Sequence, residues 1–389
     1  MSSWRHAWPG LLATLTGVGL CRFAYTPLIP FMIAAGVVTE TGAAYLGAAN
    51  VAGYLAGAAL AAPLAARFGL GRAIRTCFAA SVLALAACIW PGGFGWYAPW
   101  RVLAGATGAV LMVLAPSFLI AELPAGERGR SGGVIYTGVG AGIALSSLIV
   151  PPLAGVRIAW AWAALALGAL LTAVATWPRW RGGVAVSRAS LSLRGLGAPA
   201  LLVALAFGMD GVGFIPHMLF WVDYIARSLA LGTTAAASQW LIFGIGALLG
   251  PWLSGAVGDR IGIGRALILA FALKSAAVLL PALTAALPLL TISSLIAGAF
   301  TPGIAALSAA RMAELVAPSR QIHAWGFATL VFGSFQAVGA YGMAYAYAAW
   351  RSYVPLYAAG AGFEAAGALC AVAALLLARR SRTANPGAD

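Results

Sequence analysis

Charged side chains are scarce in this chain of 389 residues, because Asp, Glu, Lys and Arg together make up only 8% of it. Soluble domains usually carry about 25% charged residues, so a soluble globular domain is excluded. Hydrophobic residues make up 62% of the chain, and the mean hydropathy is +0.94. The composition therefore predicts a protein that crosses a membrane many times.

Acidic residues are the rarest charges, with 9 acids against 23 basic residues and a formal net charge of +14. The basic residues stand between apolar runs and form no separate basic domain, so nucleic-acid binding is not expected. No HExxH, GxSxG or Walker A motif occurs, which argues against an enzyme or an ATP-driven pump. We expect no cofactor and no metal. Metal-ligand spacing is also missing from the cysteines, which we interpret as buried, inert thiols: Cys21, Cys77, Cys88 and Cys370.

Apolar runs long enough to cross a membrane are plentiful, since a spanning helix needs about 20 mostly apolar residues. The first run continues past Gly36 without a small-residue cleavage site, so it is interpreted as a span and not as a signal peptide. The fold class expected is an all-α membrane protein. Its twelve spans are predicted at 9–35, 43–66, 73–90, 100–121, 131–152, 157–177, 199–226, 235–257, 266–285, 288–310, 325–347 and 354–378.

Arginines between the predicted spans are distributed unequally. Only Arg157, Arg227 and Arg351 fall in loops on one side, whereas the other loop arginines share a side with both termini. The positive-inside rule then places both termini in the cytoplasm. We expect a multi-pass monomer in a bacterial inner (plasma) membrane.

The second half of the chain repeats the first. RFGLGRA at 67–73 returns as RIGIGRA at 260–266, and AELPAGER at 121–128 returns as AELVAPSR at 313–320. Each repeat holds six spans, an even number, so the halves are parallel repeats. A Gly/Ser-rich stretch with four arginines separates them. The expected domains are an N-terminal six-helix bundle (1–178), a cytoplasmic basic linker (179–198) and a C-terminal six-helix bundle (199–389).

This organisation resembles the major facilitator superfamily. GAVGDRIGIGR at 255–265 is similar to the Gly-x-x-x-Asp-Arg-x-Gly loop of that superfamily, whose aspartate helps to latch the cytoplasmic side in one state. The first-half copy has Ala66 in place of that aspartate, which leaves its latch in doubt. The resemblance implies a conformational role for Asp259, Arg260 and Gly262, and for Arg67 and Gly69 in the first-half copy.

Four further segments carry the resemblance. GLCRFAYTPLIP (19–30), NVAGYLAGA (50–58) and GFIPHMLFWVDYIAR (213–227) are similar to the bacterial YbfB/YjiJ-type branch. RVLAGATG (101–108) resembles the superfamily's Arg-x-x-x-Gly pattern in span four, where the arginine is often tied to proton coupling. The resemblance implies alternating access, with spans one, four, seven and ten lining a central cavity.

Two charges lie deep inside spans one and seven. Arg22 is about 20 Å and Asp210 about 16 Å from the cytoplasmic edge, where a charge costs a few kcal/mol or more unless it is paired or faces water. We expect Arg22 to face the other half as an anion clamp or gating partner, with Asp210 as its partner and as a proton-coupling residue. The alternatives are packing of Arg22 against carbonyls freed by Pro27 and Pro30, and a permanent ion pair.

Other titratable groups in the spans form candidate pairs. His217 lies two helical turns beyond the aspartate of span seven, so it is a second proton-coupling candidate or a satisfied hydrogen-bonding residue. Asp223 and Arg227, spaced i, i+4, predict an ion pair within one helix. Lys274 in span nine and Glu364 in span twelve predict a neutralising pair inside the second half, ahead of a substrate role.

The remaining candidates are polar or aromatic side chains in the spans. Amides can bind a ligand or join neighbouring helices, and the aromatic rings can wall a cavity or fill the core. The substrate-binding candidates are Arg22, Tyr25, Asn50, Arg101, Gln239, Trp240 and Gln336.

Together these features predict a secondary active transporter that moves a small organic solute by proton-coupled alternating access. The solute is expected to be anionic because Arg22 and Arg101 lack acids nearby. The expected partners are this small-molecule substrate, protons and the lipid bilayer. The alternatives are a proton-coupled exporter of amphipathic or cationic compounds that uses Asp210, and, from another class, a non-transporting membrane sensor or a membrane-embedded enzyme.

Overall fold

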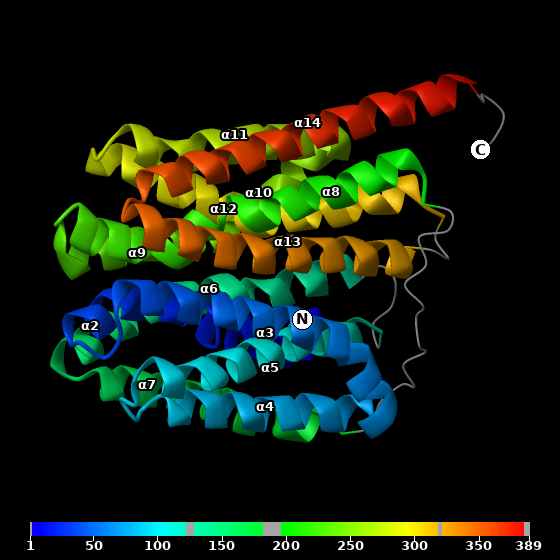
Figure 1. Ribbon diagram of the computed structural model, residues 1–389. Helices are drawn as coiled ribbons and strands as arrows, with labels where there is room; N and C mark the ends of the chain where they lie inside the picture. The colour runs from blue at the N-terminus through cyan, green and yellow to red at the C-terminus, as the bar shows by residue number, and fades with distance from the viewer. Residues whose placement is uncertain (1, 122–127, 182–195, 318–320, 385–389) are drawn as a thin grey trace.

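The structure is a computed structural model that describes residues 2–121, 128–181, 196–317 and 321–384. All regular structure in these residues is helical, and twelve helical spans run side by side (Figure 1). The predicted fold class is confirmed. Several helices are longer than the apolar runs from which they were predicted. For example, α5 begins at Gly93 rather than at 100, because a helix can extend from the hydrocarbon core into the polar interface.

The first six spans lie together in the lower part of Figure 1. Their elements are α1 (Ser2–Thr14), η1 (Leu15–Leu20), η2 (Phe23–Leu28) and α2 (Ile29–Ala34) in span one, then α3 (Glu40–Phe68), α4 (Leu70–Ala87), α5 (Gly93–Ala121), α6 (Arg128–Val156), and α7 (Ile158–Thr176) with η4 (Trp177–Arg179).

The last six spans form the upper part of the same view. Their elements are α8 (Ala198–Gly213), η5 (Pro216–Phe220), α9 (Trp221–Asp223) and η6 (Tyr224–Ser228) in span seven, then α10 (Gly232–Ile261), α11 (Ile263–Leu283), α12 (Leu287–Leu315), α13 (Gln321–Trp350) and α14 (Val354–Ala384). The predicted linker falls largely in 182–195, outside the described residues, and so do parts of the repeated segments at 121–128 and 313–320.

Spans one and seven are the two broken spans. Span one passes from a π-helical turn (η1) to a 3-10 turn (η2) at Cys21 and Arg22. Span seven ends its α-helix at Gly213 and continues through the π-helical turn η5, where Pro216 lacks the N–H that a regular helix needs. The two breaks meet across the halves, because Thr26 Oγ1 donates a hydrogen bond to the carbonyl oxygen of Met218 at 2.5 Å.

Two sharp corners show the internal repeat in three dimensions. Gly69 joins α3 to α4 at φ +85° and ψ 143°, and Gly262 joins α10 to α11 at φ +88° and ψ 140°. Side chains with a Cβ rarely adopt this conformation, so glycine permits both corners. We call the end of the bundle that holds these corners the arginine-rich end, since Arg67, Arg72, Arg260 and Arg265 flank them, and the opposite end the arginine-poor end.

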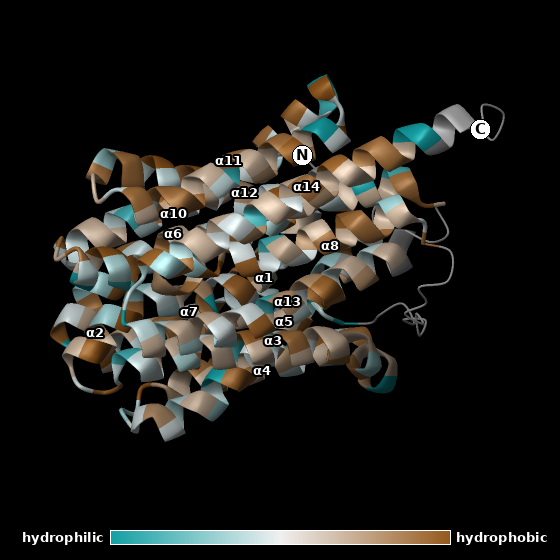
Figure 2. Ribbon diagram, turned by 45° about the horizontal axis from the view of Figure 1, so that its top comes forward, coloured by the Kyte–Doolittle hydropathy of each residue, from teal (hydrophilic) through white to brown (hydrophobic). Residues whose placement is uncertain are grey.

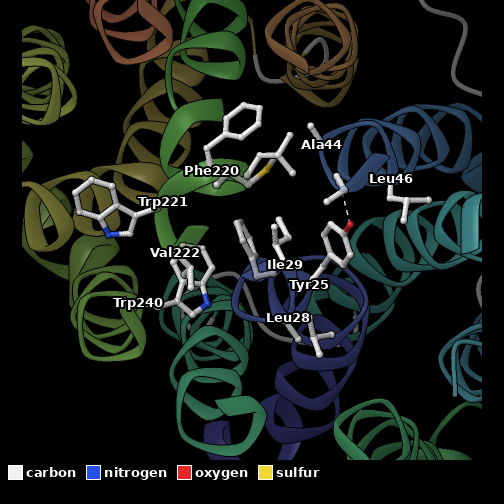
Figure 3. Packing of buried hydrophobic residues seen from close by; sticks show 14 of the residues in the cluster. Tyr25, Leu28, Ile29, Ala44, Leu46, Phe220, Trp221, Val222 and Trp240 are labelled. Carbon is white, nitrogen blue, oxygen red and sulfur yellow. Dashed lines mark hydrogen bonds between the residues drawn. The ribbon is translucent and has the colours of Figure 1, made fainter. Parts of the chain in front are cut away.

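Buried apolar side chains form three clusters. The shared core lies toward the arginine-poor end and combines side chains of both halves, such as Tyr25 and Leu46 with Phe220 and Trp240 (Figure 3). The other two cores lie toward the arginine-rich end, one inside each half. The halves are therefore packed against each other at the arginine-poor end and have separate interiors at the arginine-rich end.

Hydrophobic residues are frequent along the spans (Figure 2), and many of the large ones are exposed. Leu148, Leu171, Val338 and Leu369 are among the large apolar side chains that are exposed. An exposed apolar surface of this extent suits lipid tails and not water. The protein is thus a multi-pass membrane protein.

Candidate functional site

Arg22 stands at the break of span one, buried at the contact between the halves. Its Nη2 donates to the Sδ atom of Met218 at 3.0 Å, and its guanidinium carbon lies 4.8 Å from the centre of the Tyr54 ring. Its Nε has no hydrogen-bond partner among the described residues. Arg22 therefore does face the other half, but there it contacts a thioether and not Asp210.

Arg101 of α5 uses a carbonyl that the break sets free. The N–H of Tyr25 bonds to Arg22 O at 3.3 Å, so the carbonyl of Cys21 loses its helical partner. Arg101 Nη1 donates to this Cys21 oxygen at 2.9 Å, and Asn50 Nδ2 donates to it at 3.1 Å. The Arg101 guanidinium carbon also lies 4.3 Å from the centre of the Tyr25 ring. A broken helix thus positions a second buried cation close to the first.

The groups around both arginines enclose a very small cavity. Arg22, Arg101 and Asn50 line it from the first half, and Met218 and Leu219 close it from the second; its volume is about 10 Å³. That is room for one water molecule and not for an organic solute. In the described part of the chain neither arginine has a carboxylate partner, and Arg101 Nε and Asn50 Oδ1 lack hydrogen-bond partners. The site is positively charged, incompletely bonded and closed.

Asp210 forms its ion pair with Lys274, so the predicted pairing with Arg22 was wrong. Asp210 Oδ1 lies 2.5 Å from Lys274 Nζ, which is also 3.3 Å from Glu364 Oε1. The expected contact of Lys274 with Glu364 is present, but Asp210 shares it. The error arose because equal depth along two spans does not determine the direction in which a side chain leaves its helix. Asp210 points into the second half, towards α11 and α14.

His217 of η5 is held inside the second half. Its Nε2 lies 2.8 Å from Ser293 Oγ, and the same hydroxyl donates to the carbonyl of Ala277 at 2.6 Å. The serine proton is thus used, so His217 donates through Nε2. The imidazole also stacks on Trp221 at 4.5 Å between ring centres. These contacts hold the imidazole inside the second half, but its buried Nδ1 has no hydrogen-bond partner among the described residues.

Three other predicted candidates, Gln239, Trp240 and Gln336, do not line the small cavity. Gln239 Nε2 donates to Thr291 at 2.8 Å, and its Oε1 accepts from Ser294 at 2.9 Å, so this amide joins α10 to α12. Trp240 belongs to the shared core (Figure 3). Gln336 of α13 is fully buried, and neither of its side-chain polar atoms has a partner among the described residues.

A family model that matches almost the whole length of the chain identifies the family. The model of the family described as "Uncharacterised MFS-type transporter YbfB" matches residues 14–377. The chain belongs to the major facilitator superfamily. It is therefore a member of a family of secondary transporters. A search among curated proteins finds no match.

Two solved superfamily structures are similar in fold. One is the crystal structure of a D-xylose-proton symporter, with a TM-score of 0.72 and 17% identity over 94% of this chain and 95% of that one. The other is a partially occluded inward-open conformation of the xylose transporter XylE from E. coli, with a TM-score of 0.72 and 16% identity over 95% and 98% of the two chains. At this identity the likeness shows the superfamily fold alone.

Within this superfamily fold, Glu40 links the halves at the arginine-poor end. This first residue of α3 contacts Arg227 of η6, and its Oε2 accepts from Tyr347 at 3.0 Å and lies 3.3 Å from Arg351 Nη1. All three partners belong to the second half. The predicted pair of Arg227 with Asp223 is present at 3.4 Å, but the sequence did not suggest that Arg227 also reaches Glu40.

Tyr353 extends this network from the loop between α13 and α14. Its hydroxyl donates to Asp223 and lies 3.1 Å from the hydroxyl of Tyr347. Burial, together with the charge of Asp223, raises the pKa of Tyr353 well above its ordinary value, so the hydroxyl stays a donor. Both acids of the network, the buried Asp223 and the partly exposed Glu40, are thus supplied with donors.

The loop residues implied by the superfamily resemblance lie far from this network, at the arginine-rich end. Gly69 and Gly262 form the corners described above. Asp259 and Arg260 are exposed, and no ion pair of Arg67, Asp259 or Arg260 occurs within the described ranges. In the part of the chain that the structure describes, this loop therefore makes no ion pair with the other half.

Met218 and Tyr54 are among the site residues that the sequence did not suggest. Both are ordinary apolar or aromatic residues in apolar runs, and they matter only because they surround Arg22. Both do fall inside the segments that resemble the YbfB/YjiJ-type branch, at 213–227 and 50–58, which is the one signal that could have marked them.

Proposed function

We propose that this protein is a proton-coupled secondary transporter of a small organic anion. The observation that carries the proposal is the pair Arg22 and Arg101, two neighbouring buried arginines with no acidic partner in the described residues. An uncompensated charge inside a membrane is expensive and usually marks a functional site. Two such charges in one place favour a ligand that supplies the negative charge. Carboxylate and phosphate groups match the planar guanidinium fork.

The closed cavity requires the halves to separate before an anion can enter. Met218 and Leu219 cover the arginines from the second half, and Leu219 fits against Gly47, where an added Cβ would lie only 1.9 Å from it. Moving the second half away from α3 would uncover Arg22 and Asn50 together. The site is thus built from both halves, as alternating access requires.

The apolar cores of the two halves are separate at the arginine-rich end, whereas the halves share one core at the arginine-poor end. We propose that the arginine-rich end and both termini lie in the cytoplasm of a bacterium, with the protein in its inner membrane, because the arginine distribution favours this orientation. We include in the proposal a monomer of two six-helix domains, 1–178 and 199–389, joined by the basic linker 179–198.

The alternative of an exporter for cationic compounds depends on a free Asp210. This carboxylate is bonded to Lys274 and is buried, with 1% of its side chain exposed, so it offers no charge to a cationic ligand. Membership in a transporter family favours transport over a membrane sensor or an embedded enzyme. Anion transport is therefore the function that the site supports best.

Ligand-induced stabilisation tests the anion site. Purified protein is screened by thermal unfolding against small carboxylates, organic phosphates and matched neutral or cationic analogues, because a ligand of the folded state raises apparent stability by mass action. We expect stabilisation by a subset of the anions, lost in Arg22→Gln and in Arg101→Gln. Arg157→Gln, at an exposed arginine near the arginine-poor end, is the matched control and should keep the response.

Transport of the selected anion in proteoliposomes, with and without a pH gradient, then tests the coupling. Arg22→Lys should transport poorly although it keeps the charge, since an ammonium cannot reproduce the planar fork. The proposal is wrong if the stabilising ligands are cations or neutral compounds, if Arg22→Gln binds anions as the unmodified protein does, or if a pH gradient leaves accumulation unchanged.

A further inference from the structure

The second half contains a fully buried group of three charges that the anion site does not use. Asp210 comes from α8, Lys274 from α11 and Glu364 from α14, and each is at most 1% exposed. The single ammonium lies 2.5 Å from Asp210 Oδ1 and 3.3 Å from Glu364 Oε1. The two carboxyl groups are also close enough to interact with each other.

The charges of this group do not balance. Two carboxylates and one ammonium carry a net charge of −1, which is costly in a buried site. Two carboxylates that share one site repel each other until one of them takes up a proton. Addition of one H⁺ from water to a carboxylate oxygen makes the group neutral, with no other bond formed or broken.

The group also lacks hydrogen-bond donors for its carboxyl oxygens. Asp210 Oδ2 and both oxygens of Glu364 have no hydrogen-bond partner in the described residues, since the 3.3 Å approach of Lys274 is a charge contact without hydrogen-bond geometry. A carboxylate can only accept, whereas a protonated carboxyl group also donates. A proton on either acid would supply the donor that these buried oxygens lack.

The backbone next to the acids is shaped to receive Glu364. A Cβ on Gly213 would lie 2.6 Å from the carboxyl carbon of Glu364, and Gly213 O lies 2.7 Å from where a Cβ on Gly360 would be. Two glycines therefore let α8 and α14 approach closely at the point where α8 ends. The position of the Glu364 carboxyl is thus tied to the break in span seven.

A short chain of contacts leads from this group to the anion site. Lys274 Nζ lies 5.0 Å from the centre of the Phe214 ring. Phe214 N–H donates to Asp210 O at 3.2 Å, and Met218 N–H donates to Phe214 O at 2.9 Å. Met218 in turn receives the hydrogen bond of Arg22 at 3.0 Å. The π-helical turn η5 is therefore fixed at one side by the charged group and at the other by Arg22.

We infer that Asp210, Lys274 and Glu364 form a site that binds one proton, and that this proton holds η5 over Arg22. The close approach of two acids corresponds to the protonated state, in which η5 is seated. Loss of the proton drives the carboxylates apart and loosens η5, which uncovers the arginine. The second step deepens the proposed function, because it gives the coupling proton a place outside the anion site.

Few other titratable groups face the site. His217 lies near enough to Lys274 for their charges to interact, but its Nε2 is bonded to Ser293. Tyr357 of α14 meets the His217 ring at 5.4 Å between ring centres. The titration of the two acids must be distinguished from that of these two groups.

Infrared spectroscopy of the purified protein tests the proton site without any substrate. The unmodified protein should show a protonated-carboxyl band near neutral pH that disappears at higher pH. Glu364→Gln and Asp210→Asn should each lose the band, because the remaining acid then pairs with Lys274 as a carboxylate. Lys274→Met should keep the band to higher pH, since the ammonium no longer stabilises ionised acids. Glu314→Gln, at a partly exposed acid paired with Arg311, is the control and should leave the band unchanged.

Hydrogen exchange of the peptide that spans η5 tests the link to the anion site. After correction for the intrinsic effect of pH on exchange, residues 214–220 should exchange faster at high pH in the unmodified protein. Glu364→Gln, which imitates the protonated acid, should exchange slowly at every pH. Glu314→Gln should behave as the unmodified protein does.

Each outcome decides one step. A protein without the band, or a band that persists in both Glu364→Gln and Asp210→Asn, overturns the proton site. A band that behaves as expected, together with exchange of 214–220 that ignores pH or is equal in Glu364→Gln and the unmodified protein, overturns the link to η5. Neither readout requires an anion, so failure of the transport proposal would be seen separately, in the binding screen.

Discussion

Replacing Glu40 with glutamine should loosen the contact between the two halves at the arginine-poor end. Glu40 is the one residue of the first half in the described network there, and it holds Arg227, Tyr347 and Arg351 of the second half. Glutamine keeps the shape of the side chain but removes the charge that all three partners share. The closed arrangement of this end should therefore lose stability relative to the open one.

The size of this loss of stability follows from how far the paired side chains are exposed to water. The side chains of Glu40 and Arg227 are 32% and 30% exposed, and that of Arg351 is 61% exposed. Ion pairs of this kind contribute about 0.2–1 kcal/mol each, because water screens them, and the hydrogen bond from Tyr347 adds a similar amount. A total of roughly 1–2 kcal/mol corresponds to a change of about 5–30-fold in the ratio of open to closed molecules.

Alkylation of a buried reporter cysteine measures this ratio even when the open state is rare. Leu219→Cys places the reporter at the contact with Gly47, in a protein whose native cysteines are replaced by alanine. Glu40→Gln should increase the alkylation rate about 5–30-fold at low salt, and less at high salt, where screening already weakens the pairs.

Glu314→Gln provides the matched control. It also removes a partly exposed carboxylate, 41% exposed, from an ion pair, but its partner Arg311 lies in the same helix. The reporter should be alkylated at an unchanged rate in this variant. Equal rates for Glu40→Gln and the unmodified protein would refute the reasoning, because the network would then not favour the closed end.

Three further outcomes are expected. Lys274→Met should cost about 3–5 kcal/mol in unfolding measurements because it leaves two buried acids without a cation, whereas Glu364→Gln should cost much less because a neutral pair remains; equal losses would contradict the shared ammonium. Gly69→Ala should lower stability by about 1–2 kcal/mol through its positive φ, while Gly255→Ala, within α10 and with open space around it, should not lower it. A cysteine at the exposed position Trp90 should react with a membrane-impermeant reagent from outside the cell; labelling only from the cytoplasm would reverse the proposed orientation.

Much of the fold could be read from the sequence. Long apolar runs must form helices in a membrane, because every backbone polar group needs a partner inside the segment. The repeated RFGLGRA and RIGIGRA segments indicated the two-fold internal repeat, and the structure gives Gly69 and Gly262 nearly identical backbone angles. The branch of the superfamily was also predicted from short segments and is confirmed by the family match.

The candidate site was predicted only in part. Residue type and depth identified Arg22, Arg101 and Asp210 as charges that need an explanation, since burial of a charge is costly wherever it occurs. Depth did not say which charge meets which. Asp210 was assigned to Arg22, but the rotation of α8 about its axis turns it towards Lys274 and Glu364.

The amino-acid sequence by itself thus determined the number of spans, the internal repeat and the presence of unpaired charges, because each depends on local composition and on the cost of burial. Only the tertiary structure decided that Met218 covers Arg22, that one ammonium serves two acids and that Glu40 joins the halves. Those contacts depend on how helices from distant parts of the chain are rotated and packed, and neither periodicity nor spacing along one helix records that information.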